Sequence, residues 1–291
     1  MRTVIDAHVH IFPPEIVQRR AEFCQRDRWF AELYSDPRAR LATAEDLVAS
    51  MDEAGITVSI AAGFPWSDPG LCAYHNEYLA EAAQRSAGRI AWLATVVPHQ
   101  RQAASEAERC FQRGASGVGE LNADAQGFAW DEPGALSDLV ETCISARRPI
   151  MAHVSEPLGH RYAGKGTAWP QRFVRFLERF PDVTVVAAHW GGGLPFYELM
   201  PEVAVATNNV VYDSAASTYL YRFRVFRLVV DLVGQQRVLF ASDYPVLRQK
   251  RFLERVQREG SLTESELRAV LGENAQRIYG VQLPLVEERD T

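Results

Sequence analysis

The segment Ile5–Phe12, IDAHVHIF, joins the pattern of a buried β-strand to a pair of histidines. Its β-branched residues are typical of a strand, while His8 and His10 occupy alternate positions within it. Alternate residues of a strand point to the same side. Both imidazoles are therefore expected to project together from one face of a strand that is otherwise buried.

Seven further β-rich runs follow along the chain, and helix-like stretches with apolar residues at three- and four-residue spacing separate them. The eight runs cover residues 4–12, 57–65, 89–98, 117–122, 149–157, 183–193, 209–216 and 237–245. The helix-like stretches cover residues 44–55, 76–88, 105–115, 135–148, 171–180 and 223–234. This alternation predicts an α/β fold, a (β/α)₈ TIM barrel. An open, doubly wound sheet is the alternative, because counting strands does not establish closure.

Two more helical segments lie outside this alternation. Residues 14–34, PEIVQRRAEFCQRDRWFAELY, predict a helical insertion above the barrel mouth after the first strand. Residues 263–280 predict a C-terminal helix that closes the domain. Thr43 and Gly55 are expected to cap the helix between them. Because no linker, low-complexity tract or repeat divides the chain, residues 1–291 are expected to form a single domain.

Composition excludes several classes of partner. The chain has 31 Lys and Arg against 37 Asp and Glu, a net charge of -6, which does not favour nucleic acid or an anionic membrane. The four cysteines are scattered without a CxxC pair, as expected for free thiols in a reducing compartment. There is no signal-peptide core and no apolar run of membrane-spanning length. We therefore expect a soluble, cytoplasmic protein with a small-molecule substrate, and a homo-oligomer remains open.

Polar residues gather where the predicted strands end. Glu120 ends the fourth strand, His153 lies late in the fifth, His189 ends the sixth and Asp243 ends the eighth. In a (β/α)₈ barrel these ends surround one mouth, where active sites are built. Imidazole nitrogen and carboxylate oxygen are ligands for zinc and similar metals. A lone histidine in an apolar strand is more often a hydrogen-bonded core residue, so the prediction of a metal site depends on the whole set.

The motifs DAHVH, AHVSEP, AAHWGG and ASDYP, in this order, resemble the amidohydrolase superfamily, in its amidohydrolase-related branch. The resemblance runs from Ile5 to Pro245 and implies a distorted TIM barrel with a divalent metal at its mouth. Zinc is the expected ion, as one ion or two. The resemblance implies these metal ligands: His8, His10, His153 and Asp243. It makes His189 a catalytic acid or electrophile, or a ligand to a second metal.

Glu120 has two interpretations. Its stretch GELNAD resembles the GEIGLD strand of the TatD-like deoxyribonuclease branch, whose glutamate is a metal ligand. Other branches place a carboxylated lysine on this strand, which this chain lacks, and one-metal decarboxylases need no such bridge. Alternatively, Glu120 forms an ion pair or a hydrogen bond at the mouth. Both interpretations stay open.

The leading functional prediction is hydrolysis of an amide, ester or lactone by metal-activated water, with Asp243 taking the water's proton. His189 or the metal would stabilise the oxyanion. The same residues would serve a decarboxylase of a small aromatic or unsaturated carboxylic acid, which is the alternative. A catalytically silent barrel that only binds a ligand is the third possibility.

Two loops supply candidate substrate contacts. The loop SEPLGHRYAGKG after the fifth strand is expected to close over the mouth and grip an anionic group, and YLYRFR follows the seventh strand. An aromatic side chain beside His189 is expected to form an apolar wall. The candidate residues are Arg161, Tyr162, Lys165, Trp190, Tyr219 and Arg222. The competing interpretation is a solvated surface loop and ordinary aromatic packing.

Overall fold

The structure is a computed structural model that describes residues 3–284. Its centre is one sheet of eight parallel strands, in which each strand pairs with the next one in the sequence. The strands are β1 Ile5–His10, β2 Val58–Ala62, β3 Ile90–Ala94, β4 Gly117–Leu121, β5 Ile150–Ala152, β6 Val185–Ala187, β7 Val210–Asp213 and β8 Val238–Leu239. This order is that of a (β/α)₈ barrel.

Backbone hydrogen bonds join the two edges of the sheet. The N–H of Ala7 donates to Phe240 O at 2.9 Å, and further along the N–H of Asp243 donates to His8 O at 3.0 Å. An isolated parallel bridge pairs Val9 with Tyr244. The barrel is therefore closed between β1 and the segment after β8. The predicted α/β barrel is confirmed, and the open-sheet alternative is wrong.

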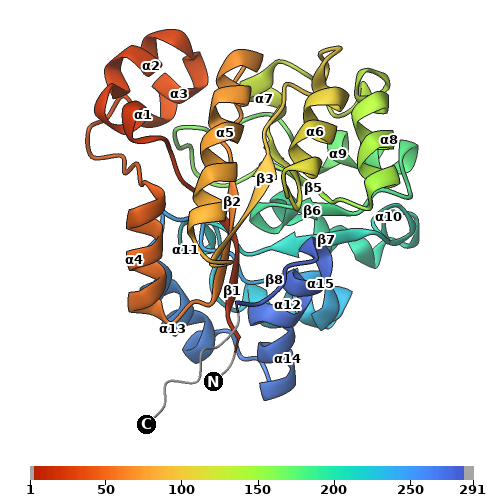
Figure 1. The fold of residues 1–291 in the computed structure, drawn as a ribbon. Helices are drawn as coiled ribbons and strands as arrows, with labels where there is room; N and C mark the ends of the chain where they lie inside the picture. The colour runs from red at the N-terminus through yellow and green to blue at the C-terminus, as the bar shows by residue number, and fades with distance from the viewer. Residues whose placement is uncertain (1–2, 285–291) are drawn as a thin grey trace.

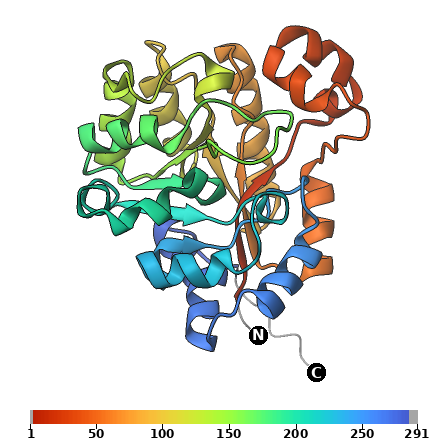
Figure 2. The ribbon, with the colours of Figure 1, turned by 180° about the vertical axis from the view of Figure 1, so that it is seen from behind.

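Helices surround the strands on the outside of the barrel (Figures 1 and 2). The α-helices are α1 Pro14–Gln18, α2 Arg20–Arg26, α3 Arg28–Tyr34, α4 Ala44–Ala54, α5 Pro69–Arg85, α6 Ala103–Gln112, α7 Ala123–Gln126, α8 Ser137–Ala146, α9 Pro170–Arg179, α10 Pro201–Ala206, α11 Ser217–Leu220, α12 Val225–Val233, α13 Gln249–Glu259, α14 Glu264–Arg268 and α15 Asn274–Tyr279. Short 3₁₀ segments are η1 Pro133–Leu136, η2 His189–Leu199 and η3 Gln235–Arg237, and η4 Ala269–Glu273 is a π-helical turn.

The predicted helices are present, with differences at their ends. Thr43 and Asp46 form a capping box on α4, and Gly55 ends that helix in the left-handed conformation, at φ 69°. Helix α5 begins earlier than predicted, because Asp68 accepts the N–H of Leu71. Helix α13 was not predicted, because its charged residues outnumber the few apolar residues that it buries.

The insertion and the C-terminal segment occupy opposite ends of the barrel (Figure 1). Helices α1 to α3 lie at the end where β1 finishes, and their aromatic residues pack on Phe12, Phe64 and Trp66. The predicted closing helix is α14, η4 and α15 in succession. A Cβ on Gly272 would lie 2.6 Å from Thr3 O, so glycine lets this segment pack closely against the start of β1.

The strands are buried on both faces, which explains their near-continuous apolar sequences. Cys72, Cys110 and Cys143 are buried, Cys24 is half-buried, and all four are free thiols, as predicted. Within residues 3–284, we find no helix whose length and apolar character would let it cross a membrane.

Candidate metal centre

The predicted metal-site residues converge at the mouth of the barrel. His8 and His10 end β1 and Glu120 lies in β4, whereas His153, His189 and Asp243 lie just beyond β5, β6 and β8. Donor atoms within 4.8 Å of one another form two groups among the described residues. The first group is His8, His10 and Asp243, and the second is Glu120, His153 and His189.

The first group presents two imidazole nitrogens to one point. The Nε2 atoms of His8 and His10 are 3.0 Å apart, and Asp243 Oδ1 lies 3.5 Å from His10 Nε2. On the far side of each ring, His8 Nδ1 contacts Asp213 Oδ2 at 2.9 Å and His10 Nδ1 contacts Ala62 O at 3.2 Å. Both Nδ1 partners are acceptors, so each Nδ1 carries a hydrogen and each Nε2 is the ring nitrogen that faces the other ring.

This donor set fits a divalent metal. The 3.0 Å separation of the two Nε2 atoms fits a hydrogen bond in which one ring donates to the other, and it also fits two nitrogens that share one ion. Two nitrogens that each bind one ion at about 2.1 Å, at a right angle, lie about 3.0 Å apart. Mixed imidazole and carboxylate donors suit zinc, manganese and related ions. The geometry of His8, His10 and Asp243 therefore matches the predicted chemistry.

Glu120 lies between the two groups. Its Oε2 is 3.7 Å from the Nε2 atoms of both His8 and His10. Its Oε1 is 2.9 Å from His153 Nδ1 and 3.3 Å from His189 Nε2. Burial raises the pKa of Glu120, but the positive charges of His153 and His8 outweigh burial and hold it well below its usual range. A bridging carboxylate in contact with four histidines thus stays ionised.

The surroundings shift the pKa values of the site histidines in different directions. Burial lowers the pKa of His8, but the charges of Glu120 and Asp213 raise it well above its ordinary value. Burial and the neighbouring His8 lower the pKa of His10. Burial also opposes the charge on His189, yet hydrogen bonding to Glu120 and its charge raise the pKa of His189 to about 9.

Two site residues adopt the left-handed backbone conformation that favours glycine. His189 has φ 58° and Asp243 has φ 61°. Such a conformation costs about 1–3 kcal/mol for a residue with a side chain, and is retained where the surroundings enforce it. Behind His189, a Cβ on Gly192 would lie 2.5 Å from Ser155 O, so this turn requires glycine. The sharp turns after β6 and β8 carry these two side chains at the barrel mouth.

Two residues at the site were not predicted. Asp213 ends β7, and its Oδ1 accepts the backbone N–H of His189 at 2.9 Å. The signal for Asp213 was present, because it is a polar residue at a strand end. Tyr34 of α3 is buried, and burial together with the charges of Asp243 and Glu120 raises its pKa. No sequence signal identifies Tyr34, because its position depends on how the insertion packs.

The loop after β5 is tied to its surroundings. Gly164 N–H donates to Glu32 on the insertion at 3.1 Å, and Thr167 N–H donates to Asp124 at 2.7 Å. Gly166 N–H donates to Ser155 Oγ, which is also 3.3 Å from His153 Nε2. The loop therefore spans from the insertion to the side of β4, next to His153.

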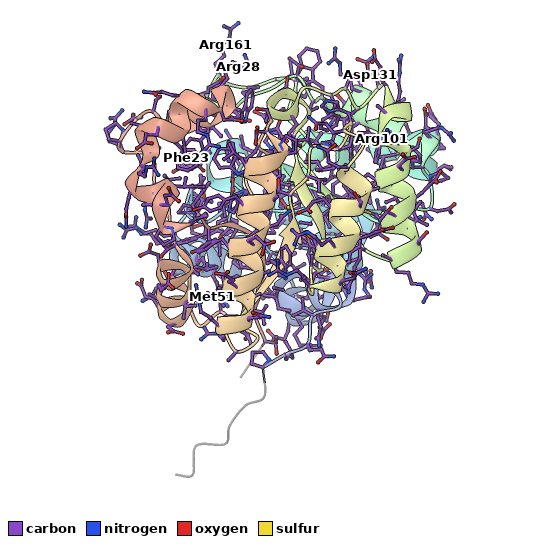
Figure 3. All side chains as sticks on the ribbon, turned by 45° about the horizontal axis from the view of Figure 1, so that its top comes forward. Phe23, Arg28, Met51, Arg101, Asp131 and Arg161 are labelled. Atoms are coloured by element: carbon purple, nitrogen blue, oxygen red, sulfur yellow. The ribbon has the colours of Figure 1, made fainter. Side chains whose placement is uncertain are left out.

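The cations of this loop do not converge on the histidines. Lys165 Nζ lies 3.1 Å from Glu156 Oε1, and Tyr162 donates its hydroxyl hydrogen to Glu156 Oε2 at 3.0 Å. Arg161 is exposed at the rim of the molecule (Figure 3). Of the two predicted cations, Lys165 is thus neutralised by its own loop and Arg161 faces solvent.

The remaining candidates are one buried core residue and two exposed side chains. Trp190 is fully buried, packs on Phe226 and donates its indole N–H to Ser217 Oγ at 2.7 Å. It is a core residue, and the expected apolar wall is corrected accordingly. Tyr219 is 58% exposed beside α13, and Arg222 is also exposed.

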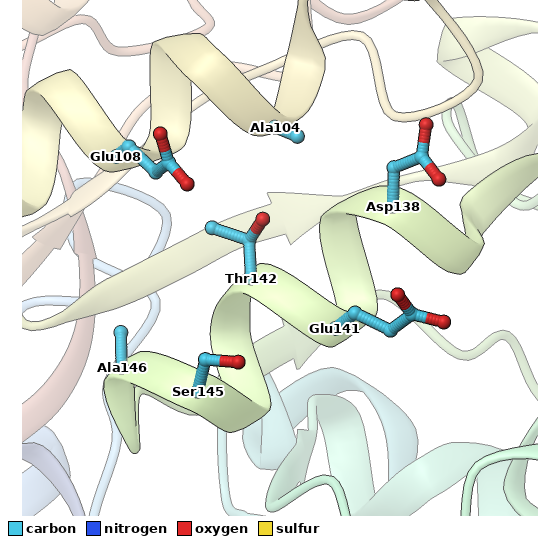
Figure 4. A pocket seen from close by; sticks show the side chains of 7 residues that line it. All are labelled: Ala104, Glu108, Asp138, Glu141, Thr142, Ser145 and Ala146. Atoms are coloured by element: carbon cyan, nitrogen blue, oxygen red, sulfur yellow. The ribbon is translucent and has the colours of Figure 1, made fainter.

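A separate hollow of about 640 Å³ lies between α6 and α8, outside the barrel (Figure 4). Its acidic side chains are Glu108, Asp138 and Glu141. None of them belongs to either group of potential metal ligands within residues 3–284. The chemistry of this molecule therefore centres on the barrel mouth.

Comparison with known proteins identifies the family. The model of the amidohydrolase family matches residues 5–281. The chain belongs to the amidohydrolase family. This chain is 23% identical over 300 residues to the 2-amino-3-carboxymuconate-6-semialdehyde decarboxylase of Dictyostelium discoideum, covering 83% of this chain and 81% of that protein.

Solved structures agree with this fold. The 5-carboxyvanillate decarboxylase of Sphingomonas paucimobilis superposes on this chain with a TM-score of 0.78 and 19% identity, covering 97% of this chain and 100% of that one. The corresponding enzyme of Novosphingobium aromaticivorans, with manganese and 4-hydroxy-3-methoxy-5-nitrobenzoic acid, gives a TM-score of 0.75 and 17% identity, covering 96% of both chains. At these identities, the structures establish the fold.

Proposed function

We propose that this amidohydrolase is a metal-dependent decarboxylase of a small aromatic or unsaturated carboxylic acid. The decarboxylase similarity over most of the chain favours this reaction over the hydrolysis that the sequence suggested first. The structural observation that carries the proposal is the 3.3 Å contact between His189 Nε2 and Glu120 Oε1. Decarboxylation must end with a proton on carbon, and this contact provides a buried, protonated donor at the mouth.

We assign the metal ligands as His8, His10, His153 and Asp243, with Glu120 as a further ligand between the two groups. A bound divalent ion would supply Lewis acidity and positive charge for the substrate. We favour manganese over the expected zinc, because a similar solved structure contains manganese. Elemental analysis of the purified protein decides between the two ions.

The proposed reaction replaces a carboxylate by a proton on one substrate carbon. The bond between the substrate carbon and its carboxylate breaks, carbon dioxide leaves, and the electron pair remains on the carbon. His189 donates the proton from Nε2 to that carbon, and solvent returns a proton to the imidazole. Glu120 keeps His189 protonated beforehand, since its carboxylate raises the pKa of His189 to about 9.

We expect a phenol and charged side chains near the barrel mouth to take part in substrate recognition. Tyr162 is half-buried, and burial and the charges of Glu156 and Asp243 raise its pKa, so its phenol lies in the field of the site. We propose Tyr162 as a substrate contact. Arg161 is proposed only as a remote contact for an anionic substituent, and Lys165 only as the partner that fixes Glu156. Trp190, Tyr219 and Arg222 have no role in this proposal.

Hydrolysis remains the second candidate, because Asp243 Oδ1 lies 3.5 Å from His10 Nε2 and would accept a proton from water at the same centre. The test is to incubate the Mn²⁺-loaded protein with hydroxybenzoates, lactones and amides in D₂O. Released carbon dioxide together with deuterium on the product carbon supports decarboxylation. A hydrolysed acid without carbon dioxide supports hydrolysis instead. A protein that binds no Mn²⁺ and turns over no compound of the panel would favour the silent barrel.

A further inference from the structure

Asp6 is a fully buried carboxylate that neither the proton transfer nor the ligand set uses. It belongs to β1, whose pairing with β2 shifts register between Asp6 and Val9, just where the strand reaches His8. Its Oδ1 accepts the backbone N–H of Ser242 at 2.8 Å, and its Oδ2 accepts the Ser242 hydroxyl at 2.5 Å. Gln249 Nε2 donates to the same Oδ2 at 2.8 Å. Three donors therefore converge on one buried side chain, and one of them comes from α13.

These bonds lie at the seam where the sheet closes. Strand β8 comprises only Val238–Leu239, so the regular ladder between β7 and β8 ends before Asp243 is reached. Beyond this point, Asp243 turns into the left-handed region, at φ 61°. The Ser242 hydroxyl also accepts the N–H of Tyr244 at 3.1 Å, so Ser242 and its partners hold the turn on both sides of Asp243.

We propose that Asp6 is a positioning residue that fixes Asp243 relative to His8 and His10. Asp6 lies two residues before His8 on β1, and Ser242 lies directly before Asp243. One carboxylate thus locks the two strands that supply the first donor group. The inference rests on the ligand assignment in the proposed function, but not on the reaction that the enzyme catalyses.

A carboxylate is required at this position because every partner donates. The Ser242 N–H, its hydroxyl and Gln249 Nε2 all point hydrogens at Asp6. An asparagine would direct its N–H₂ either at the Ser242 backbone N–H, which cannot turn away, or at both the Ser242 hydroxyl and the Gln249 amide, which would both have to turn. The turn that carries Asp243 would loosen as a result.

The test measures binding of Mn²⁺ alone to metal-free protein, together with the urea unfolding midpoint. The matched control is Asp27→Asn. Asp27 is also buried, and it accepts the Ser67 N–H at 3.0 Å and the Ser67 hydroxyl at 2.8 Å, but these contacts hold the insertion. Partners of metal ligands typically change affinity by about 10–100-fold. Asp6→Asn should weaken Mn²⁺ binding by that factor, while Asp27→Asn should lower the unfolding midpoint and keep the Mn²⁺ affinity within about twofold of the wild type.

A second variant, Ser242→Ala, removes only one hydroxyl and keeps the inference testable if Asp6→Asn does not fold. It should also weaken Mn²⁺ binding. Wild-type affinity in folded Asp6→Asn or Ser242→Ala would overturn the positioning role alone and make Asp6 an ordinary core residue. Equal losses in Asp6→Asn and Asp27→Asn would overturn it as well. Absence of Mn²⁺ binding in the wild type would overturn the ligand assignment and this inference together.

Discussion

Asp213 Oδ2 lies 2.9 Å from His8 Nδ1, although the two residues are 205 positions apart in the chain. The carboxylate is fully buried, and it fixes the tautomer that turns His8 Nε2 toward His10. Its other oxygen accepts the backbone N–H of His189. One aspartate at the end of β7 thus holds the side chain of His8 in one donor group and the backbone of His189 in the other.

Asp213→Asn should weaken metal binding by about 10–100-fold, because the amide would face the His8 Nδ1–H and destabilise the required tautomer. Titration of metal-free protein with Mn²⁺ measures this effect. Asp138→Asn, in the exposed hollow between α6 and α8, is the control and should retain wild-type affinity. An unchanged dissociation constant in Asp213→Asn would show that the His8 tautomer does not depend on this contact.

His189→Asn distinguishes a one-metal site from a two-metal site. With one ion in the first group, the variant should keep its metal and lose most activity, because it lacks the proposed proton donor. With a second ion between Glu120, His153 and His189, metal stoichiometry should fall as well. Elemental analysis and turnover are measured on the same sample. If neither changes, His189 is a structural residue.

Tyr34→Phe tests whether the insertion contributes to substrate binding. Within residues 3–284 the Tyr34 hydroxyl has no hydrogen-bond partner, yet the phenol lies in the field of Asp243 and Glu120. Loss of one neutral hydrogen bond to substrate costs about 0.5–1.5 kcal/mol, or about a twofold to tenfold rise in KM. Metal content should not change. Tyr74→Phe, whose hydroxyl donates to Glu15 at the surface, should leave KM unaltered; similar KM values for both variants would remove Tyr34 from the substrate site.

From the lowered pKa of His75 we expect the folded protein to lose stability in mild acid. Burial, and to a lesser extent the neighbouring His10, lower its pKa to about 4 from 6.5, while its Nε2 contacts Ile11 O at 2.7 Å. Between these values the unfolded chain binds a proton that the folded chain does not. The free energy of unfolding should therefore fall as pH falls from 6.5 to 4, by up to about 3 kcal/mol.

Urea unfolding of metal-free protein at pH 7.5 and pH 5 measures this dependence. His75→Gln removes the titrating group, so its stability should change less with pH than that of the wild type. His99→Gln is the control, since His99 follows the third strand and is not part of the buried core. Parallel pH profiles for wild type and His75→Gln would mean that His75 does not cause the acid sensitivity.

The sequence alone predicted the elements of this barrel, because their signals are local. Period-two and period-3.6 patterns depend on neighbours in the chain, and the capping box at Thr43 and the left-handed Gly55 involve residues three or four apart. The histidines and carboxylates could be assigned to the mouth for the same reason. Each lies at or just beyond the end of a strand, and parallel strands of a closed barrel end on the same side.

Tertiary structure decided which of these groups touch. Closure of β1 against the segment after β8 pairs Asp6 with Ser242, and the return of β7 brings Asp213 to His8. Packing of the insertion places Tyr34 at the site, and the fold of a single loop pairs Lys165 with Glu156. Local periodicity carries no information on these pairs, because their contacts form only when segments distant in the chain pack around one closed sheet.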